Sequence, residues 1–249
     1  MPAYNAARTL GRTWRAIPAD AVDEVLLVDD GSSDATLEIA AGLPIRVIAL
    51  PHNAGYGANQ KVCYLEALRM RADVVVMLHP DGQYDPALIP ELAAPLLAGE
   101  ADMVLGSRML VRGGARAGRM PEHRWLANRV LTTFENLVLR RSFSELHTGY
   151  RAYSAAFLRR VPFLRNSNDF VFDSQIIAQA VAFDCRVAEV PIQTRYDSDA
   201  SSTTMSANLR YGAATLWTMA RFALDRLGLI RCQLFVAGPP RSRRGRRRW

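Results

Sequence analysis

The stretch Glu24–Asp34, EVLLVDDGSSD, decides the fold of this 249-residue chain. Four apolar residues in succession lead into two carboxylates, the pattern of a buried parallel strand whose carboxyl end reaches a functional edge of a sheet. Gly31 permits a tight turn, and the polar oxygens of residues 32–34 can cap a following helix. The stretch therefore predicts one strand–helix unit of a parallel sheet.

The same alternation of short apolar runs and helical stretches continues on the carboxyl side of this unit. Alternating units of this length predict an α/β fold with a mostly parallel, doubly wound sheet, whose ligands lie beyond the carboxyl ends of the strands. In chain order, the expected elements are a strand at 24–30, a helix at 33–41, a strand at 45–50, a helix at 57–70, a strand at 73–78, a helix at 86–97, a strand at 102–105, a helix at 121–139, a strand at 150–153, a helix at 172–183 and a strand at 186–192.

The N-terminal residues do not fit this alternation. Pro2 and Asn5 resemble a turn that enters a helix, and no apolar run stands before them to form the strand that such a turn should follow. We therefore expect the first strand of the sheet to be missing.

The C-terminal part is predicted to be an amphipathic helix with a basic tail. Between residue 207 and about residue 227, the apolar side chains lean to one side of a helix, which either lies on a lipid surface or packs on the domain. Residues 239–249 are predicted to form a disordered tail. The residues expected on the apolar side are Leu209, Leu216, Met219 and Phe222.

The composition of the chain limits where in the cell the protein can act and which partners it can bind. Hydrophobic residues make up 49% of the chain, and the tail supplies six of its formal net charge of +7. The body has no basic stripe with interleaved aromatic residues, so a nucleic-acid partner is not expected. Three scattered cysteines, no secretory signal and no run of 18 uncharged apolar residues predict a cytoplasmic protein that is at most peripheral on the membrane.

Two loops carry chemistry at predicted strand ends. Asp29 and Asp30 are suited to hydrogen bonding with a nucleobase or ribose, although a capped turn with solvated aspartates has the same pattern. In HPDGQYDP, residues 79–86, Asp81 and Gln83 stand two apart on an extended segment, so their oxygens can face the same way. Such oxygens suit Mg²⁺ or Mn²⁺ shared with the phosphates of a ligand. A helix-capping loop is the alternative here.

Five motifs together give the chain a family resemblance. They occur in the order and spacing of glycosyltransferase family 2, and the chain resembles the polyprenyl-phosphate sugar transferases of that family, of the dolichol-phosphate mannosyltransferase type, from residue 2 to about residue 205. The motifs are PAYN at 2–5, DDGSSDAT at 29–36, NAGYGAN at 53–59, HPDGQYDP at 79–86 and LGSRM at 105–109, and HTGYRAY at 147–153, FVFDSQ at 170–175 and AEVPIQTRY at 188–196 agree with them.

The resemblance implies a GT-A fold, a nucleotide-diphosphate sugar donor, a divalent cation and inversion at the anomeric carbon. Asp81 and Gln83 match the metal-binding positions of the family. His79 departs from the pattern, because many relatives carry an aspartate there and a neutral imidazole adds no negative charge. The residues that the resemblance assigns to the donor are Pro2, Tyr4, Asn5, Asp29, Asp30, Gly31, Asn53, Gly55 and Arg195.

The resemblance also implies an acceptor site for a lipid phosphate, with Arg108, Arg124 and Asn128 facing that phosphate. A phosphate oxygen is already anionic at neutral pH and attacks without a general base, whereas a sugar hydroxyl needs a carboxylate. Asp173 is the candidate base for a hydroxyl acceptor. Gln175 stands where hydroxyl-using relatives often carry a second acid, which weakly favours a phosphate acceptor. The predicted catalytic residues are Asp81, Arg108 and Asp173.

These assignments divide the chain into functional segments. Residues 1–110 are expected to bind the nucleotide sugar and 111–204 to bind the acceptor, followed by a membrane-proximal helix at 205–238 and the tail at 239–249. The last two segments fit docking on anionic lipid at the inner face of the cell membrane. Two other functions stay open: transfer to a saccharide or small-molecule hydroxyl, and a catalytically silent homologue that binds a membrane or a partner.

Overall fold

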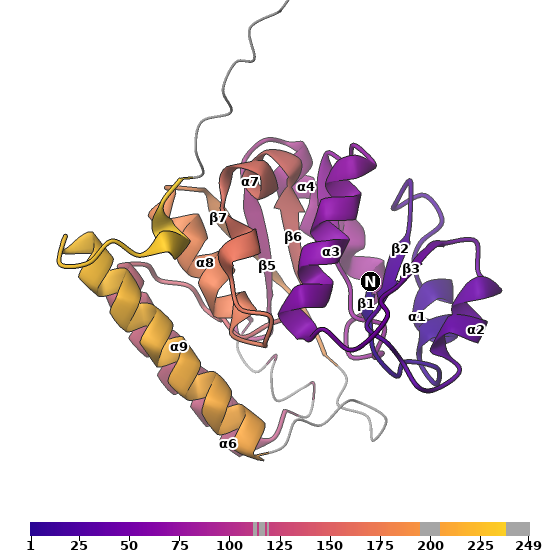
Figure 1. Ribbon diagram of the computed structural model, residues 1–249, viewed down its shortest axis with the longest axis horizontal. Coiled ribbons are helices and arrows are strands. Elements are labelled where there is room, and N and C mark those ends of the chain that lie inside the picture. The colour runs from indigo at the N-terminus through magenta and orange to yellow at the C-terminus, as the bar shows by residue number, and fades with distance from the viewer. Residues whose placement is uncertain (112–113, 115–117, 119, 195–204, 238–249) are drawn as a thin grey trace, which may run out of the picture.

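The computed structural model arranges the chain in three parts along its longest axis (Figure 1). One end holds a small sheet with helices α1 and α2, the middle holds a second sheet between α4 and the helices α3 and α8, and the other end holds α6 and α9 side by side. The residues that the structure describes are 1–111, 114, 118, 120–194 and 205–237.

The first sheet is parallel throughout and has the order β1-β2-β3. Its strands are β1 (Pro2–Ala3), β2 (Leu26–Asp29) and β3 (Arg46–Ala49). The sequence predicted that the first strand is missing. The structure has the two-residue strand β1 at this place, and its Pro2 pairs with Val28. A short strand is thus present at this place, because the carbonyl oxygens of Met1 and Ala3 accept hydrogen bonds from the amides of Val28 and Asp30.

The second sheet has the order β4-β6-β5-β7, and β6 runs against both of its neighbours. The sequence predicted the strand but not its direction. The chain leaves β5 at its carboxyl end, passes through α6 and enters β6 at the same edge, where Leu105 pairs with Arg151. A strand that enters at that edge runs backwards. The strands are β4 (Val74–Met77), β5 (Met103–Ser107), β6 (Arg151–Ser154) and β7 (Val187–Pro191).

The predicted helices are all present, with ends that differ by a few residues from those predicted. Asp85 caps a short 3-10 turn at Pro86–Leu88, as expected, by accepting a hydrogen bond from the amide of Ala87 at 3.0 Å. Two helices, α1 and α7, were not given bounds from the sequence. The helices are α1 (Leu10–Arg15), α2 (Thr36–Ala41), α3 (Tyr56–Arg69), α4 (Ile89–Leu97), α6 (Glu122–Leu139), α7 (Ala155–Arg160), α8 (Phe172–Ala182) and α9 (Met205–Arg226).

The core is divided between the two faces of the second sheet. Successive residues of a strand point to opposite faces, so Met103 and Leu105 pack with α3 and α8 while Val104 packs with α4. Tyr153 and Ala152 of β6 divide in the same way. Helices therefore cover both faces, and the carboxyl end of the parallel strands is left for the site.

Helix α9 packs against α6 and α8, but not as the sequence predicted. Met219 and Phe222 are buried, whereas Leu209 is 68% and Leu216 is 43% exposed. The prediction that these four side chains share one face was wrong, because at 3.6 residues per turn Leu209 and Phe222 lie about 140° apart around the helix. The helix both packs on the domain and presents apolar side chains outward.

Two glycines bring the loop before α3 against the loop before α8. The amide of Gly57 donates to the carbonyl oxygen of Asn168 at 2.8 Å. Gly55 has a φ of +101°, and a Cβ atom there would lie 2.6 Å from that same carbonyl oxygen. A Cβ atom at Gly57 would collide with the carbonyl oxygen of Ser167. We call this backbone-to-backbone contact the glycine contact.

Candidate active site

The turn after β2 is closed by the side chain of Asp29. This buried carboxylate accepts hydrogen bonds from the amide and the hydroxyl of Ser32, at 2.9 and 2.5 Å. Gly31 has a φ of +70°, which only glycine adopts easily, and a Cβ atom there would lie 2.7 Å from the backbone of His52. The DDGSS segment is therefore shaped by its own bonds before any ligand arrives.

Asp30 is directed toward a neighbouring loop. Its two carboxylate oxygens accept hydrogen bonds from the amides of Ala54 at 2.7 Å and Gly55 at 3.0 Å. Charge-assisted bonds of this kind are stronger than neutral ones. Asp30 thus holds the loop that carries Asn53 against the end of β2, and Asn53 itself is exposed. The role of Asp30 as a direct donor ligand stays a prediction.

Pro2, Tyr4 and Asn5 lie beside this turn. Pro2 is buried in β1, and Tyr4 is 53% exposed. Asn5 has a φ of +51°. Its side-chain oxygen accepts a hydrogen bond from the backbone amide of Ser33 at 2.9 Å. Its backbone amide donates to the Ser32 hydroxyl at 2.8 Å. The structure therefore brings together the predicted donor residues of the first two motifs.

The loop after β4 presents Asp81 and Gln83. One oxygen of Asp81 accepts a hydrogen bond from the backbone amide of Gln83 at 3.0 Å. The other oxygen accepts none from the described residues, and no cation among them pairs with this carboxylate. Thr9 fixes the loop from the side, because its hydroxyl donates to the carbonyl oxygen of Pro80 at 2.5 Å. Asp81 is therefore held in place without an ion-pair partner among the described residues, although the guanidinium of Arg12 lies against the neighbouring Gly82.

His79 is part of an aromatic stack. Its ring lies parallel to the ring of Tyr56, with centroids 5.5 Å apart, and Tyr56 stacks in turn on Phe170 at 4.6 Å. Burial lowers the pKa of His79 despite the opposing charges of Asp81 and Asp173. The imidazole is therefore neutral at pH 7 and adds no charge beside Asp81.

Asp173, in the first turn of α8, is surrounded by donors. The hydroxyl of Tyr56 donates to one oxygen at 2.9 Å, and the amide of Gln60 donates to the other at 3.2 Å. The guanidinium of the buried Arg151 lies 3.3 Å from that second oxygen. Burial alone would lower the pKa of Arg151, but the charge of Asp173 raises it above its ordinary value. Asp173 and Arg151 thus form a buried ion pair.

The fit of a divalent cation can be judged from these donors. Among the described residues, no group of three or more His, Cys, Asp and Glu side chains is placed to hold a metal. Asp81 and Gln83 nevertheless offer oxygens from one loop, and Mg²⁺ is ordinarily held by one or two carboxylates together with substrate phosphates. The residues fit a cation that is shared with a diphosphate, and they do not form a complete cage.

Two of the three predicted acceptor residues, Arg108 and Asn128, meet at a buried glutamate that the sequence did not single out. Glu145 accepts hydrogen bonds from the backbone amide of Arg108 at 2.7 Å and from its Nε at 2.8 Å, and forms an ion pair with its guanidinium. The amide of Asn128 donates to Glu145 at 2.7 Å. Arg124, one turn before Asn128 on α6, is half-buried and has no partner among the described residues. Glu145 therefore sets the position of Arg108 and Asn128.

A series of buried polar contacts links this cluster to α9. Arg108 donates to the carbonyl oxygen of His147 at 2.7 Å. The ring of His147 lies 2.9 Å from the carboxylate of Glu135 on one side and 2.7 Å from the hydroxyl of Tyr211 on the other. Tyr211 also lies 3.3 Å from the hydroxyl of Ser174, next to Asp173. The acceptor-side arginine and the start of α8 are thus both linked to one tyrosine of α9.

Sequence reasoning missed several residues of the site. Gln60, Arg151 and Tyr56 stood within or beside quoted motifs, but nothing in the sequence shows that all three converge on Asp173. Glu145 had no signal of its own. The assigned residue Arg195 lies outside the described residues.

Comparison with known proteins places this α/β architecture. The family model described as glycosyl transferase family 2 matches residues 1–161. The chain belongs to glycosyltransferase family 2, and it is a glycosyltransferase. It is 27% identical over 248 residues to the undecaprenyl-phosphate mannosyltransferase of Micrococcus luteus, covering 92% of this chain and 98% of that protein. It is 35% identical over 169 residues to the low-salt glycan biosynthesis hexosyltransferase Agl6 of Haloferax volcanii, covering 67% of this chain and 39% of that one.

Solved structures show the same fold. The crystal structure of glucosyl-3-phosphoglycerate synthase from Mycobacterium tuberculosis in complex with UDP superposes with a TM-score of 0.68 at 19% identity, covering 92% of this chain and 79% of that chain. The complex of that synthase with Mn²⁺, UDP-glucose and phosphoglyceric acid gives a TM-score of 0.65 at 21% identity, with coverages of 92% and 78%. The expected GT-A fold is confirmed.

Proposed function

We propose that this enzyme transfers a sugar, with inversion, from a nucleotide-diphosphate sugar to a polyprenyl phosphate at a membrane surface. The observation that carries the proposal is the state of Asp173, whose oxygens are engaged by Arg151, Gln60 and Tyr56. Both oxygens of Asp173 already accept hydrogen bonds or pair with a cation, so neither is left free to face an acceptor hydroxyl. A hydroxyl acceptor needs a base, whereas an anionic phosphate does not.

The relatives support a lipid phosphate as the acceptor. Besides the undecaprenyl-phosphate enzyme, the chain is 25% identical over 213 residues to the UDP-N-acetylglucosamine–dolichyl-phosphate N-acetylglucosaminyltransferase of Methanococcus voltae, covering 79% of this chain and 84% of that protein. Both names state a polyprenyl phosphate as acceptor. We extend that acceptor class to this chain.

On the donor side, the end of β2 binds the nucleoside and the loop after β4 binds the cation. The turn shaped by Asp29 and Gly31 and the loop held by Asp30 form the nucleoside pocket, with Tyr4 as an exposed ring beside it. Asp81 and Gln83 hold a divalent cation that neutralises the charge of the departing diphosphate. Because Asp81 has no cationic partner among the described residues, its charge is available for this task.

On the acceptor side, the protein aligns an anion that needs no activation. Arg108 is fixed by Glu145, so its place is set before the acceptor binds. In this proposal the acceptor phosphate lies beside that ion pair. Arg124 supplies a second cation with no competing partner among the described residues. An inverting reaction requires the attacking oxygen on the face of the sugar opposite to the diphosphate. The acceptor cluster comes from the end of β5 and from α6, whereas the metal loop follows β4.

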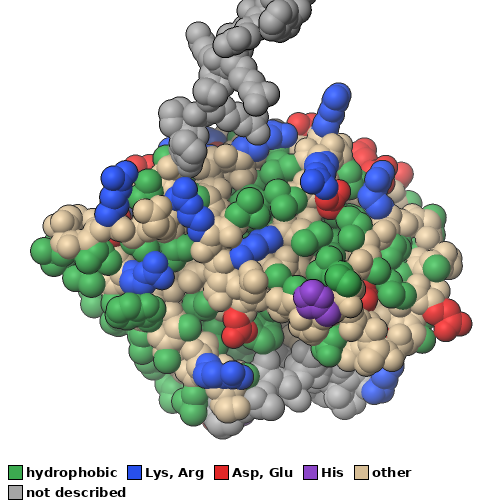
Figure 2. Space-filling model, viewed as in Figure 1, with side chains coloured by type: hydrophobic (Ala, Val, Ile, Leu, Met, Phe, Trp, Pro, Cys, Tyr) green, Lys and Arg blue, Asp and Glu red, His purple; other side chains and the backbone are tan. Residues whose placement is uncertain are grey.

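The outer surface of α6 supports docking on a membrane. The helix buries Asn128, Thr132 and Glu135, and of its apolar residues only Leu139 at its end, yet it exposes large apolar side chains. This is the reverse of the pattern of an ordinary surface helix. Apolar side chains also gather over α9 with basic side chains among them (Figure 2). The exposed residues are Leu126, Val130, Phe134 and Leu137 on α6, Leu209, Leu216 and Trp217 on α9, and Leu227, Leu229 and Ile230 after it.

An apolar surface of this extent marks a contact site in a soluble protein. No helix in the described part of the chain has the length and apolarity to cross a bilayer. We therefore propose that the α6–α9 surface lies in the interface of the membrane at its cytoplasmic face. The division at residues 110, 204 and 238 stays part of this proposal, and the tail at 239–249 lies outside the described residues.

A thermal-shift screen of nucleoside diphosphates and their sugars, with and without Mn²⁺, tests the donor site. A ligand that binds the native state raises the melting temperature. We expect a shift that is larger with Mn²⁺ and lost in Asp81→Ala, while Asp85→Asn, which keeps a helix cap nearby, behaves as wild type.

Transfer of the best donor's sugar to citronellyl phosphate, compared with transfer to free saccharides, tests the acceptor class. We expect a prenyl-phosphate sugar as the product. Transfer to saccharides alone would contradict the proposal and reinstate Asp173 as a base.

A further inference from the structure

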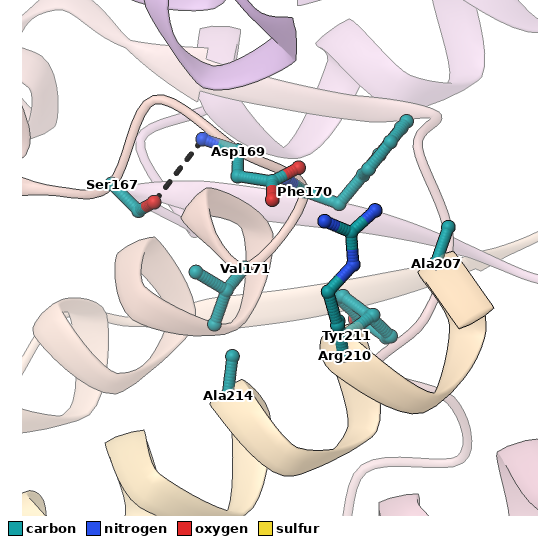
Figure 3. Close-up of a pocket in the computed structure, with 8 residues that line it drawn as sticks. All are labelled: Ser167, Asp169, Phe170, Val171, Ala207, Arg210, Tyr211 and Ala214. Atoms are coloured by element: carbon teal, nitrogen blue, oxygen red, sulfur yellow. Dashed lines mark hydrogen bonds between the residues drawn. The ribbon is translucent and has the colours of Figure 1, made fainter.

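A pocket of about 200 Å³ opens between α9 and the segment 167–171 that leads into α8. Figure 3 shows Val171 and Ala214 facing each other across it, with Phe170 and Arg210 near its other end. We call it the α9 pocket. It is too small for a whole drug-sized ligand, so it suits one short segment of a larger molecule.

The lining of the α9 pocket is mostly apolar. Val171, Ala214 and the rings of Phe170 and Tyr211 form its walls. Two charged side chains of opposite sign, Asp169 and Arg210, also line it (Figure 3). With both signs present, this lining has no preference for an anion. Apolar walls with balanced charge select an apolar group.

The pocket shares a wall with the candidate active site. Phe170 stacks on Tyr56, which stacks on His79 and donates to Asp173. Tyr211, in the opposite wall, bonds to the ring of His147, whose carbonyl oxygen accepts from Arg108. A ligand in the pocket therefore lies directly behind the residues that flank the reaction, on the side where the acceptor arginine is fixed.

The pocket also adjoins the outward face of α9. Its lining residues Arg210, Tyr211 and Ala214 alternate along the helix with the exposed residues Leu209 and Ala213. A chain that leaves the pocket across this helix passes directly onto the exposed apolar surface of α6 and α9. The pocket thus lies behind one wall of the reaction site and next to the proposed membrane surface.

We propose that the α9 pocket binds the isoprenoid segment next to the phosphate of the lipid acceptor. This inference rests on the proposed function, which supplies the phosphate, and it adds the residues that recognise the first apolar part of the chain. The phosphate stays near Arg108, and the rest of the lipid extends over α9.

The test is to fill the pocket and compare two acceptors. Ala214→Trp places a ring inside it, and Ala213→Trp places the same ring on the exposed face one residue away. Turnover is measured with citronellyl phosphate, which has an isoprenoid chain, and with butyl phosphate, which has a short unbranched one. The donor is the nucleotide sugar that gives the largest thermal shift with wild type.

We expect Ala214→Trp to raise the KM for citronellyl phosphate about tenfold, which corresponds to the loss of roughly two buried methylene groups. The kcat/KM for butyl phosphate should stay within about twofold. Ala213→Trp should leave both acceptors within about twofold. Donor-induced thermal shifts of both variants show whether the fold is kept, and Ala207→Leu fills the same pocket with a smaller group if Ala214→Trp unfolds.

Three results are contrary. If pocket-filling variants leave citronellyl phosphate unaffected, or if both acceptors lose equally, the pocket does not bind the chain, while the proposed function stands. If Ala213→Trp has the same effect as Ala214→Trp, the apolar surface and not the pocket is responsible. If wild type uses neither phosphate, the proposed function itself fails and the inference falls with it.

Discussion

The tip of β4 and the start of α8 each present one aspartate to the same site, and the two are held in opposite ways. Asp81 accepts a single hydrogen bond from its own loop and forms no ion pair with the described residues, although the guanidinium of Arg12 lies against the neighbouring Gly82. Asp173 has donors from α3 and β6 on both of its oxygens, including a buried arginine. His79 and Tyr56, stacked on each other, lie between the two regions.

The difference shows how one site can use one aspartate, Asp81, for its charge and another, Asp173, to stabilise the fold. A carboxylate without an ion-pair partner keeps its negative charge available, and it can bind a cation that arrives with a diphosphate. A carboxylate saturated with donors is already balanced, and it stabilises the fold around it. Two chemically identical side chains therefore have different predicted functions because of their neighbours alone.

The largest expected effect is on stability, at Arg151. Arg151→Met leaves the charge of Asp173 buried and unpaired, which should lower the free energy of unfolding by about 3–5 kcal/mol. Urea denaturation measures the loss. Arg186, which pairs with Asp102 on the surface, is the matched control, and Arg186→Met should leave the denaturation midpoint almost unchanged. Equal effects of the two substitutions would remove the distinction drawn for Asp173.

The next effect is on catalysis, at Asp81. Asp81→Asn keeps the size and the turn but removes the charge, so kcat should fall about 100- to 1,000-fold. Steady-state kinetics with and without Mn²⁺ measure the loss, and Asp85→Asn serves as the control on the same loop. A variant that keeps wild-type turnover and metal response would show that the unpaired charge has no catalytic task.

A smaller effect on catalysis is expected when Asp173 itself is neutralised, although the loss of its charge also leaves Arg151 buried without an ion pair and so lowers stability. Asp173→Asn should lower kcat less than about tenfold, because a phosphate acceptor needs no base, whereas loss of a general base costs about 100- to 10,000-fold. Donor binding should be retained. Turnover and thermal shift on the same sample separate the two cases. A loss in the upper range with donor still bound would assign Asp173 to catalysis and favour a hydroxyl acceptor.

The smallest effect is expected at the residue between the two regions. Tyr56→Phe removes one hydrogen bond to Asp173 but keeps the stacked ring, so the free energy of unfolding should fall by about 1 kcal/mol. Urea denaturation again measures it. Tyr56→Leu also removes the stacking with His79 and should cost more. If both variants lose the same amount, the hydroxyl and not the ring is the important part.

The strands and most helices could be predicted because each is a local pattern. A buried apolar run such as 74–77, bounded by turn residues, indicates a strand wherever it lies in the fold. The direction of β6 could not be predicted in this way, because it depends on the edge at which the chain returns after α6. Nor could the faces of α9, since tertiary packing decides which of its apolar side chains are buried.

The candidate site was predictable to the level of its loops. Asp29, Asp30 and Asp81 follow predicted strands, and the structure places them at strand ends. Their partners were not predictable, because they come from distant segments: Glu145 lies 37 residues from Arg108, and Tyr56 lies 117 residues from Asp173. The sequence names residues that can do the chemistry, and only the fold shows which of them are already engaged.

The glycine contact has a mechanical consequence. Because Gly55 and Gly57 have no side chains, the backbone of the loop around Asn53 touches the backbone at Ser167 and Asn168 with no compressible layer between them. A nucleotide that displaces the first loop must carry the second with it. The loop around Asn53 and the segment that ends in Phe170 are therefore linked by a joint made of main chain alone.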